Sequence, residues 1–401
     1  MNASVKQIIL ATAVSLALLT QPLAASAKVQ NPAKPVIGSV KVTETGFTLN
    51  YKTDSKNASQ IKRLDYSING GAKWLRALRS PIKVAGLSSG VSYAFQLKQT
   101  AKSGAVTKVA KTVKILGTLI ESPKLTGFTV GKLLWSDEFN QKGQTKLNSA
   151  SWTSRFCGGE GSNGGGTCYN NESQYYLPSA NTLDGSAEGN AVITTRHIAT
   201  PPAFGSCFGS TCAFTSGRFD TQGKVAFQYG YIETRMKMPS GSGNWPAFWM
   251  LGDTSATLGW PASGEIDIAE QGGDRPTRNS GAVHYSTTSS GCCDNHRYDF
   301  GESFGTTDYS LDYHNYSMAW LPNEIRLYVD GDLFFTSIAG QTQSDIWPFN
   351  NPFFLIFDNA VGPQDGSAAF GGEWSGWSES KTKIDWVRVF QLNSKGVVTK
   401  H

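Results

Sequence analysis

Apolar and polar residues alternate with a period of two along most of this chain, in short runs separated by glycine-rich turns. Residues 230–238 and 325–331 are typical, because every second side chain in them is apolar, as in a strand with one buried face. No stretch keeps a helical period. No repeat of 20 to 50 residues is visible, which disfavours a propeller. The pattern predicts an all-β protein whose larger part is a two-sheet sandwich of the jelly-roll, concanavalin-like type.

The first part of the chain has its own set of strand-like runs. Residues 46–51 and 64–68 alternate, and the second run ends at an Asn-Gly-Gly turn typical of hairpins. Residues 87–95 resemble the stretch of fibronectin type III domains that carries their tyrosine corner, with Tyr93 in that role. The sequence therefore predicts a small β-sandwich module at residues 28–116.

Charge divides the chain at the same place. Residues 28–120 carry a net charge of +13, whereas residues 121–401 carry −9 and hold ten of the 11 tryptophans. So sharp a change indicates two modules with different roles, joined by a linker at 117–130 and ending with a large sandwich at 131–395. The basic module either binds an anionic cell-wall or matrix polymer or is a solvated spacer. We expect no nucleic-acid partner, and a monomer.

The N-terminal 27 residues read as a signal peptide. Lys6 supplies the positive region, residues 8–20 form an apolar stretch, and residues 25–27 form a small-residue cleavage site. The apolar stretch is shorter than the ~20 residues that span a bilayer, although an uncleaved anchor is the alternative. We therefore expect a secreted, extracellular protein.

Export changes how the cysteines are interpreted. Their even number in an oxidising compartment predicts disulfides, with 157–168 and 207–212 as local pairs and the pairing of the adjacent 292 and 293 left open. A zinc site near His296 is the alternative, but the chain has no paired C-x-x-C spacing. The six cysteines are Cys157, Cys168, Cys207, Cys212, Cys292 and Cys293.

The segment 264–270 gathers three carboxylates. In a strand, Glu265 and Asp267 point to one face while the two isoleucines between the acids point to the other. Strict alternation would send Glu270 to the apolar face, and a β-bulge at 268–269 would return it to the acidic one. Three acids in a row repel one another, so the segment indicates either a catalytic strand or an exposed acidic edge strand.

Tryptophans surround this acidic strand in the sequence. Trp245 and Trp249 lie upstream on one face of a predicted strand, and Trp260 lies between the two motifs. Indole rings stack on the apolar faces of sugars, and carboxylates bind sugar hydroxyls, so the combination suits a polysaccharide groove. The alternative is that part of this aromatic set belongs to the core.

Paired carboxylates are the usual machinery of glycoside hydrolysis, one as nucleophile and one as acid and base. Glu265 and Glu270 lie ~13 Å apart along an extended backbone, so their side chains must converge for this chemistry. Asp267 between them would hydrogen-bond Glu265 and raise the pKa of the acid. No cofactor is required.

Residues 260–270 resemble the signature of glycoside hydrolase family 16. The extra residue before the last glutamate is similar to the bulged, laminarinase-like branch of that family. Further matches, in the family's order, lie at 170–176, 216–219, 245–252, 283–285, 328–331 and in the closing strand with Asp385.

The resemblance implies a retaining endo-β-1,3-glucanase that hydrolyses β-glucan. It assigns Glu265 as nucleophile, Glu270 as acid/base and Asp267 as assisting carboxylate. The family also implies a structural calcium near Glu138 and Asp385, both of which could instead be surface charges. The implied substrate-binding residues are Asn170, Asn171, Arg218, Trp245, Trp249 and His284.

The same sequence also permits other roles for two of these residues and other substrates. Arg218 could pair with a structural acid, and His284 could be a core histidine. The substrate could be mixed-linkage β-1,3-1,4-glucan or a galactan such as agar, since the bulged motif occurs across those branches. A non-catalytic β-glucan-binding protein is a further alternative, which the presence of both glutamates disfavours.

Overall fold

The chain divides into two compact units, Met1–Leu116 and Gly117–His401. The computed structural model describes residues 30–43, 46–77, 79–85, 92–114, 120, 122–141, 143–156, 172–186, 189–199, 213–289, 295–306, 308–344, 346–363 and 370–401. The predicted signal peptide, all six cysteines with their disulfide and zinc interpretations, Asn170 and Asn171 lie outside the described residues.

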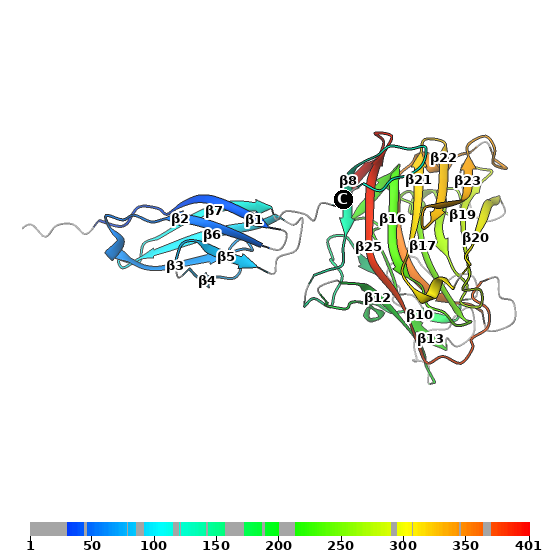
Figure 1. The fold of residues 1–401 in the computed structure, drawn as a ribbon, viewed down its shortest axis with the longest axis horizontal. Coiled ribbons are helices and arrows are strands. Elements are labelled where there is room, and N and C mark those ends of the chain that lie inside the picture. The colour runs from blue at the N-terminus through cyan, green and yellow to red at the C-terminus, as the bar shows by residue number, and fades with distance from the viewer. Residues whose placement is uncertain are drawn as a thin grey trace, which may run out of the picture. The chain divides into compact units, whose positions relative to one another are not determined.

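The first unit is a sandwich of two antiparallel sheets (Figure 1). One sheet has the order β1 (Val36–Thr43), β2 (Gly46–Lys52), β5 (Ile82–Ala85). The other has the order β4 (Leu75–Arg76), β3 (Ile61–Ser67), β6 (Ser92–Ala101), β7 (Val106–Lys114), and a short 3-10 helix spans Ala58–Gln60. The alternating apolar residues Phe47 and Leu49 of β2 form one core with Phe95 and Leu97 of β6. Tyr93 packs against this core, and its tyrosine-corner role stays a prediction.

The second unit is built from two larger sheets. In the ten-stranded sheet the main order is β10 (Gln174–Tyr176), β13 (Phe214–Ser216), β12 (Ala191–His197), β25 (Glu379–Leu392), β16 (Gly230–Lys237), β21 (His314–Leu321), β22 (Glu324–Val329), β23 (Asp332–Ile338), with β11 (Asn181–Leu183) beside β12 and β8 (Val130–Asp137) beside β25. In the nine-stranded sheet the order is β20 (His296–Phe304), β19 (Arg278–Ser286), β18 (Glu265–Glu270), β17 (Asn244–Gly252), β24 (Phe353–Val361), β14 (Arg218–Asp220), β9 (Thr153–Ser154), with β15 (Val225–Gln228) between β24 and β26 (Val397–Lys400).

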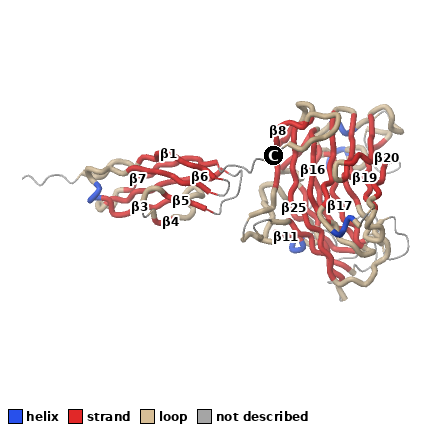
Figure 2. Tube along the Cα trace, viewed as in Figure 1, coloured by secondary structure: helices blue, strands red, loops and turns tan. Residues whose placement is uncertain are grey.

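Helices contribute little to either unit (Figure 2). The second unit has one short α-helix, α1 (Ser255–Leu258), and 3-10 turns at Pro178–Ala180, Tyr309–Leu311 and Pro348–Asn350 in its described part. None of the helices in the described part of the chain has the length and apolar character needed to cross a bilayer. The prediction of an all-β, two-sheet sandwich is confirmed.

One hydrophobic core fills the space between the two sheets of the second unit. The nine-stranded sheet contributes Phe248, Ile266 and Phe357, and the ten-stranded sheet contributes Ile232 and Trp320, all completely buried. Because side chains alternate along a strand, the polar residues between these apolar ones point to the opposite, outer face of the nine-stranded sheet. The carboxylates of the acidic strand β18 lie on this outer face.

Candidate active site

The carboxylates of β18 lie on one face because the strand contains a bulge. Trp249 of β17 is paired with Asp267, and its neighbour Phe248 with Ala269, so Ile268 has no partner across this ladder. The same extra residue appears on the β19 side, where Asp267 faces Ala282 and Glu270 faces Ser280. Ile268 and Ala269 are both buried in the core. The predicted bulge at 268–269 is confirmed, and it returns Glu270 to the face of Glu265 and Asp267.

Each of the two glutamates accepts a hydrogen bond from a tryptophan. Trp260 Nε1 donates to Glu265 Oε2 and Trp245 Nε1 donates to Glu270 Oε1, both at 2.9 Å. The ring of Trp245 also stacks on Phe370, with 5.3 Å between centroids and 21° between planes. These tryptophans therefore hold the carboxylates in place through their N–H groups, a role that the sequence did not suggest.

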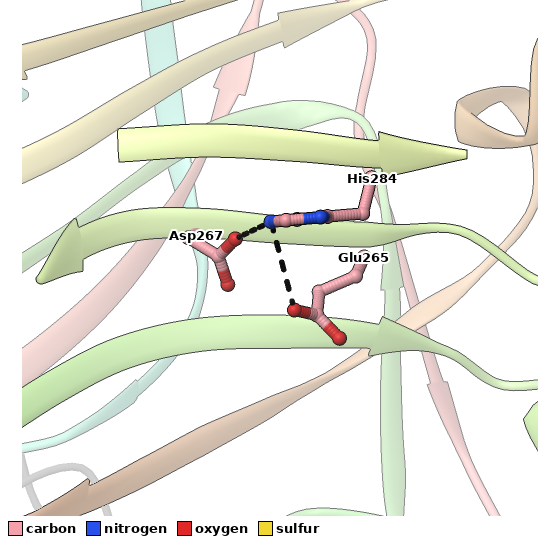
Figure 3. Close-up of side chains that lie close together, drawn as sticks. All are labelled: Glu265, Asp267 and His284. Atoms are coloured by element: carbon pink, nitrogen blue, oxygen red, sulfur yellow. Dashed lines mark ion pairs between the residues drawn. The ribbon is translucent and has the colours of Figure 1, made fainter. Parts of the chain in front are cut away.

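His284 lies beside the carboxylates on the adjacent strand β19. Its Nε2 atom is 2.9 Å from Asp267 Oδ2 and 4.0 Å from Glu265 Oε1 (Figure 3). On the other side of the ring, Nδ1 is 2.8 Å from His296 Nε2. His284 thus belongs to the site rather than to the core, as the resemblance implied.

Two further acids extend the cluster, and neither was expected from the sequence as a site residue. Asp358 of β24 accepts hydrogen bonds from Trp249 Nε1 at 3.2 Å and from Tyr176 Oη at 2.9 Å. Glu172 accepts from Gln174 Nε2 at 2.7 Å. Asp358 was detectable in principle, as the one acid in an otherwise almost wholly apolar strand.

Burial and mutual repulsion raise the pKa of the acids in this cluster. Burial first, and then the charge of Asp267, raises the pKa of Glu265 and of Glu270 to about 8. Burial and the charge of Asp358 raise the pKa of Asp267 to about 8, and burial raises that of Asp358 as well. The pKa of Glu172 also rises to about 8, through burial and then the charge of Asp358. Such a cluster retains protons at neutral pH, so one carboxyl can be an acid beside an ionised neighbour.

Arg218 lies in the same site. It is paired with Asp358 across β14 and β24, and its guanidinium carbon lies 4.8 Å from the ring centroid of Trp249. Its positive charge lowers the pKa of Asp358 and of Glu172 against the effect of burial. The structure therefore brings together every candidate catalytic or substrate-binding residue that it describes: Arg218, Trp245, Trp249, Glu265, Asp267, Glu270 and His284.

The expectation of calcium at Glu138 and Asp385 is not supported. Glu138 accepts two hydrogen bonds from Arg388, at 3.2 and 2.7 Å, and Asp385 forms a 2.6 Å ion pair with Arg235. Each carboxylate is already neutralised by a guanidinium, so the pair does not fit a divalent cation. In the described part of the chain, the one group of three ligating side chains close enough for a metal ion is that of Glu265, Asp267 and His284.

Comparison with known proteins relates this geometry to carbohydrate enzymes. The family model "Glycosyl hydrolases family 16" matches residues 171–388. A beta-glucanase of Rhodothermus marinus is 34% identical over 272 residues, which cover 65% of this chain and 85% of that protein. A keratan-sulfate endo-1,4-beta-galactosidase of Sphingobacterium multivorum is 32% identical over 273 residues, again 65% of this chain but only 55% of the relative's length.

Solved structures also relate this chain to carbohydrate enzymes. The catalytic domain of an endo-1,3-beta-glucanase (laminarinase) from Thermotoga petrophila RKU-1 is 31% identical, with a TM-score of 0.53. The match covers 65% of this chain and 98% of that domain. The similarity therefore includes the whole catalytic domain of the neighbour.

Proposed function

This chain belongs to glycosyl hydrolase family 16, and we propose on that basis that it cleaves β-1,3-glucan internally, with retention of anomeric configuration. The chain is a glycoside hydrolase that acts on O-glycosyl bonds, with laminarinase-like homologues. The linkage it prefers and its stereochemistry are the proposed part.

The observation that carries the proposal is the bulge that sets Glu265, Asp267 and Glu270 on one face of β18. Glu265 acts as the nucleophile at the anomeric carbon in its ionised form, and His284 and the N–H of Trp260 oppose the burial and the Asp267 charge that raise its pKa. Glu270 protonates the leaving oxygen and then activates water, which requires the raised pKa that burial and Asp267 supply.

The neighbouring side chains suit a sugar chain. The rings of Trp245 and Trp249 are only partly buried and offer apolar surface to pyranose rings. Arg218, Asp358 and Glu172 add hydrogen-bonding groups on the same side of the site. Asn170 and Asn171 remain proposed contacts.

A galactan is the second candidate substrate, because a keratan-sulfate endo-galactosidase is among the relatives. Parallel digestion of laminarin, lichenan, agarose and keratan sulfate would distinguish the candidates. We expect laminarin to be cut fastest, into oligosaccharides of mixed length. Faster release from agarose or keratan sulfate would overturn the linkage assignment, and faster release from lichenan would make the enzyme a mixed-linkage glucanase.

We also infer that the chain is exported, from the signal-like residues 1–27. A large polymer cannot enter the cytoplasm, so an endo-acting glucanase needs to work outside it. N-terminal sequencing of the secreted protein should give a start near Lys28.

A further inference from the structure

Strand β20 carries a row of exposed aromatic side chains on one face. Tyr298, Phe300 and Phe304 lie on one face of the strand, with Glu302 between the two phenylalanines, and keep 51%, 61% and 63% of their surface exposed. In the described part of the sheet, β20 is the outermost strand and pairs with β19 alone. Large exposed apolar groups gathered in one place usually mark a binding surface. We call Tyr298, Phe300 and Phe304 the edge aromatic row.

The register of the sheet places this row on the face of the carboxylates. Tyr298 is paired with His284, which is paired with Glu265. Residues paired across strands point to the same side of a sheet, so Tyr298 shares the face of the catalytic acids. Two strand spacings separate the row from β18, which amounts to ~10 Å.

Small side chains lie between the row and the acids. Phe300 is paired with Ala282, which is paired with Asp267. Ser280 occupies the same intermediate position beside Glu270. A chain that leaves Asp267 in this direction therefore passes over the methyl group of Ala282 before it meets the ring of Phe300, whereas the path over Ser280 leads to Glu302.

The row is continuous with the site at one end and has polar groups at the other. The ring of Tyr298 lies 5.6 Å from that of His284, at 22°, and 6.0 Å from that of Phe300. At the far end, the guanidinium carbon of Arg278 lies 5.0 Å from the ring centroid of Phe304. Rings flanked by hydrogen-bonding groups are the surface that a neutral sugar chain requires.

We propose that the edge aromatic row binds the part of a long glucan chain that extends beyond the carboxylates over Ala282. This inference rests on the proposed function, because it assigns the occupant as the same β-glucan. It makes the row a determinant of preference for polymer over short oligosaccharides. Tyr298 contacts the glucan chain next to His284, and Phe300 and Phe304 supply the apolar surface farther from the carboxylates.

The test compares Phe300→Ala/Phe304→Ala with the unmodified chain on long laminarin and on a laminari-trisaccharide. We expect kcat/KM for the polymer, relative to that for the trisaccharide, to fall ~10-fold, through KM. Binding of the Glu265→Gln protein to insoluble β-1,3-glucan should weaken when the same two changes are added. Phe300→Trp should retain the preference, because it keeps an aromatic face.

Leu311→Ala and Leu333→Ala are matched controls, since these side chains are 70% and 50% exposed and belong to other strands and turns. Both should leave the ratio unchanged. An unchanged ratio in the double alanine variant would overturn the proposal, as would an equal loss on both substrates. A dimer that the variant converts to monomer in sedimentation velocity, with polymer KM unaffected, would make the row a contact between copies and would also overturn it. Failure of the unmodified chain on laminarin is a separate result, which rejects the proposed function itself.

Discussion

The Nδ1 atom of His284 lies 2.8 Å from Nε2 of His296, with the two imidazole rings nearly parallel at 16°. One of these two ring nitrogens donates and the other accepts, so a hydrogen bond joins the two rings. The ring of His296 is held in turn against Trp260, at 4.6 Å between centroids. His296 therefore positions the histidine that faces the catalytic acids, although it touches none of them.

Replacement of His296 by Phe should lower kcat. The change keeps an aromatic ring against Trp260 but removes the nitrogen that hydrogen-bonds His284, and the loss of one hydrogen bond corresponds to a fall of ~10-fold. KM should change less, and His296→Gln, which keeps an N–H donor, should recover part of the rate. His314→Phe is the control, because His314 belongs to β21 of the other sheet. Its Nδ1 atom lies 2.6 Å from Asp330 Oδ2. A kcat equal to that of the unmodified enzyme in His296→Phe would contradict the positioning role.

Glu265→Gln and Glu270→Gln should each lose activity by ~10³-fold or more while binding to glucan survives. An amide keeps an oxygen that accepts the indole N–H, so the fold of the site should remain. Added azide should restore glycosyl transfer in a Glu270 variant given a substrate with an activated leaving group, because the glycosyl-enzyme still forms. Glu324→Gln, on the other sheet, is the control. Near-normal turnover in either Gln variant would reject the assignment of that residue.

The raised pKa of Glu270 predicts an alkaline limit to activity. The acid must be protonated, so the rate should fall as pH rises through about 8. Asp267→Asn removes the charge that helps to raise this pKa, and the alkaline limb should therefore move to lower pH. A profile of kcat/KM against pH for both proteins measures the shift. A limb that stays in place would mean that Asp267 does not act on Glu270 through its charge.

The same carboxyls link stability to pH. Their pKa values in the folded chain, about 8, exceed the ordinary value of 4.5 for glutamate, so the folded state binds more protons between these limits. This contribution to the free energy of unfolding is complete below about pH 4.5 and is lost as pH rises through 8. We expect Tm to decline over that interval, and to decline less in Asp267→Asn. Asp332→Asn, in β23, should keep the wild-type slope in the same thermal scans.

The bulge could be predicted from the sequence because of a local conflict. Apolar side chains at 266, 268 and 269 all need burial, whereas an acid at 270 does not, and only an extra residue satisfies both. Asp358 is conspicuous as the one acid of an almost wholly apolar strand, but the sequence could not show that Asp358, Glu172 and His296 belong to this site. Asp358 and His296 join the site through the sheet order β20-β19-β18-β17-β24, and Glu172 joins it from the segment before β10 of the other sheet. A period of two contains no information on which strands become neighbours.

The hydrogen-bond and ion-pair partners of the side chains could not be predicted from the sequence either. The tryptophans were expected as stacking surfaces, but two of their indole N–H groups hold Glu265 and Glu270. The arginine partners of Glu138 and Asp385 could not be predicted for the same reason. An arginine lies within hydrogen-bonding distance of each acid in the folded sheet, and nothing in the linear pattern assigns those pairs.

Deletion of residues 28–116 should leave hydrolysis of soluble laminarin intact. The first unit has its own hydrophobic core, and all the described catalytic side chains belong to the second. If the basic module tethers the enzyme, the loss should appear only on insoluble or anionic wall material, and added salt should abolish the difference. Rates for both proteins on both materials, at low and high ionic strength, test this. A collapse of activity on soluble laminarin would mean that the second unit depends on the first for its fold.

The last prediction is that the first-formed reducing ends keep the β configuration. Retaining enzymes hold their two carboxyl groups ~5–5.5 Å apart, whereas inverting enzymes need ~6.5–9.5 Å to accommodate a water molecule. The bulge of β18 sets Glu265 and Glu270 on one face with Asp267 between them, so the three carboxyl groups form one cluster. In such a cluster the nucleophile can reach the anomeric carbon directly. Proton NMR within minutes of mixing, before mutarotation, distinguishes the anomers. Predominant β-anomer fits Glu265 as nucleophile, and predominant α-anomer would require a general base in its place. Elongated oligosaccharides at high substrate concentration would show a sugar, in place of water, accepting the glycosyl group from Glu265.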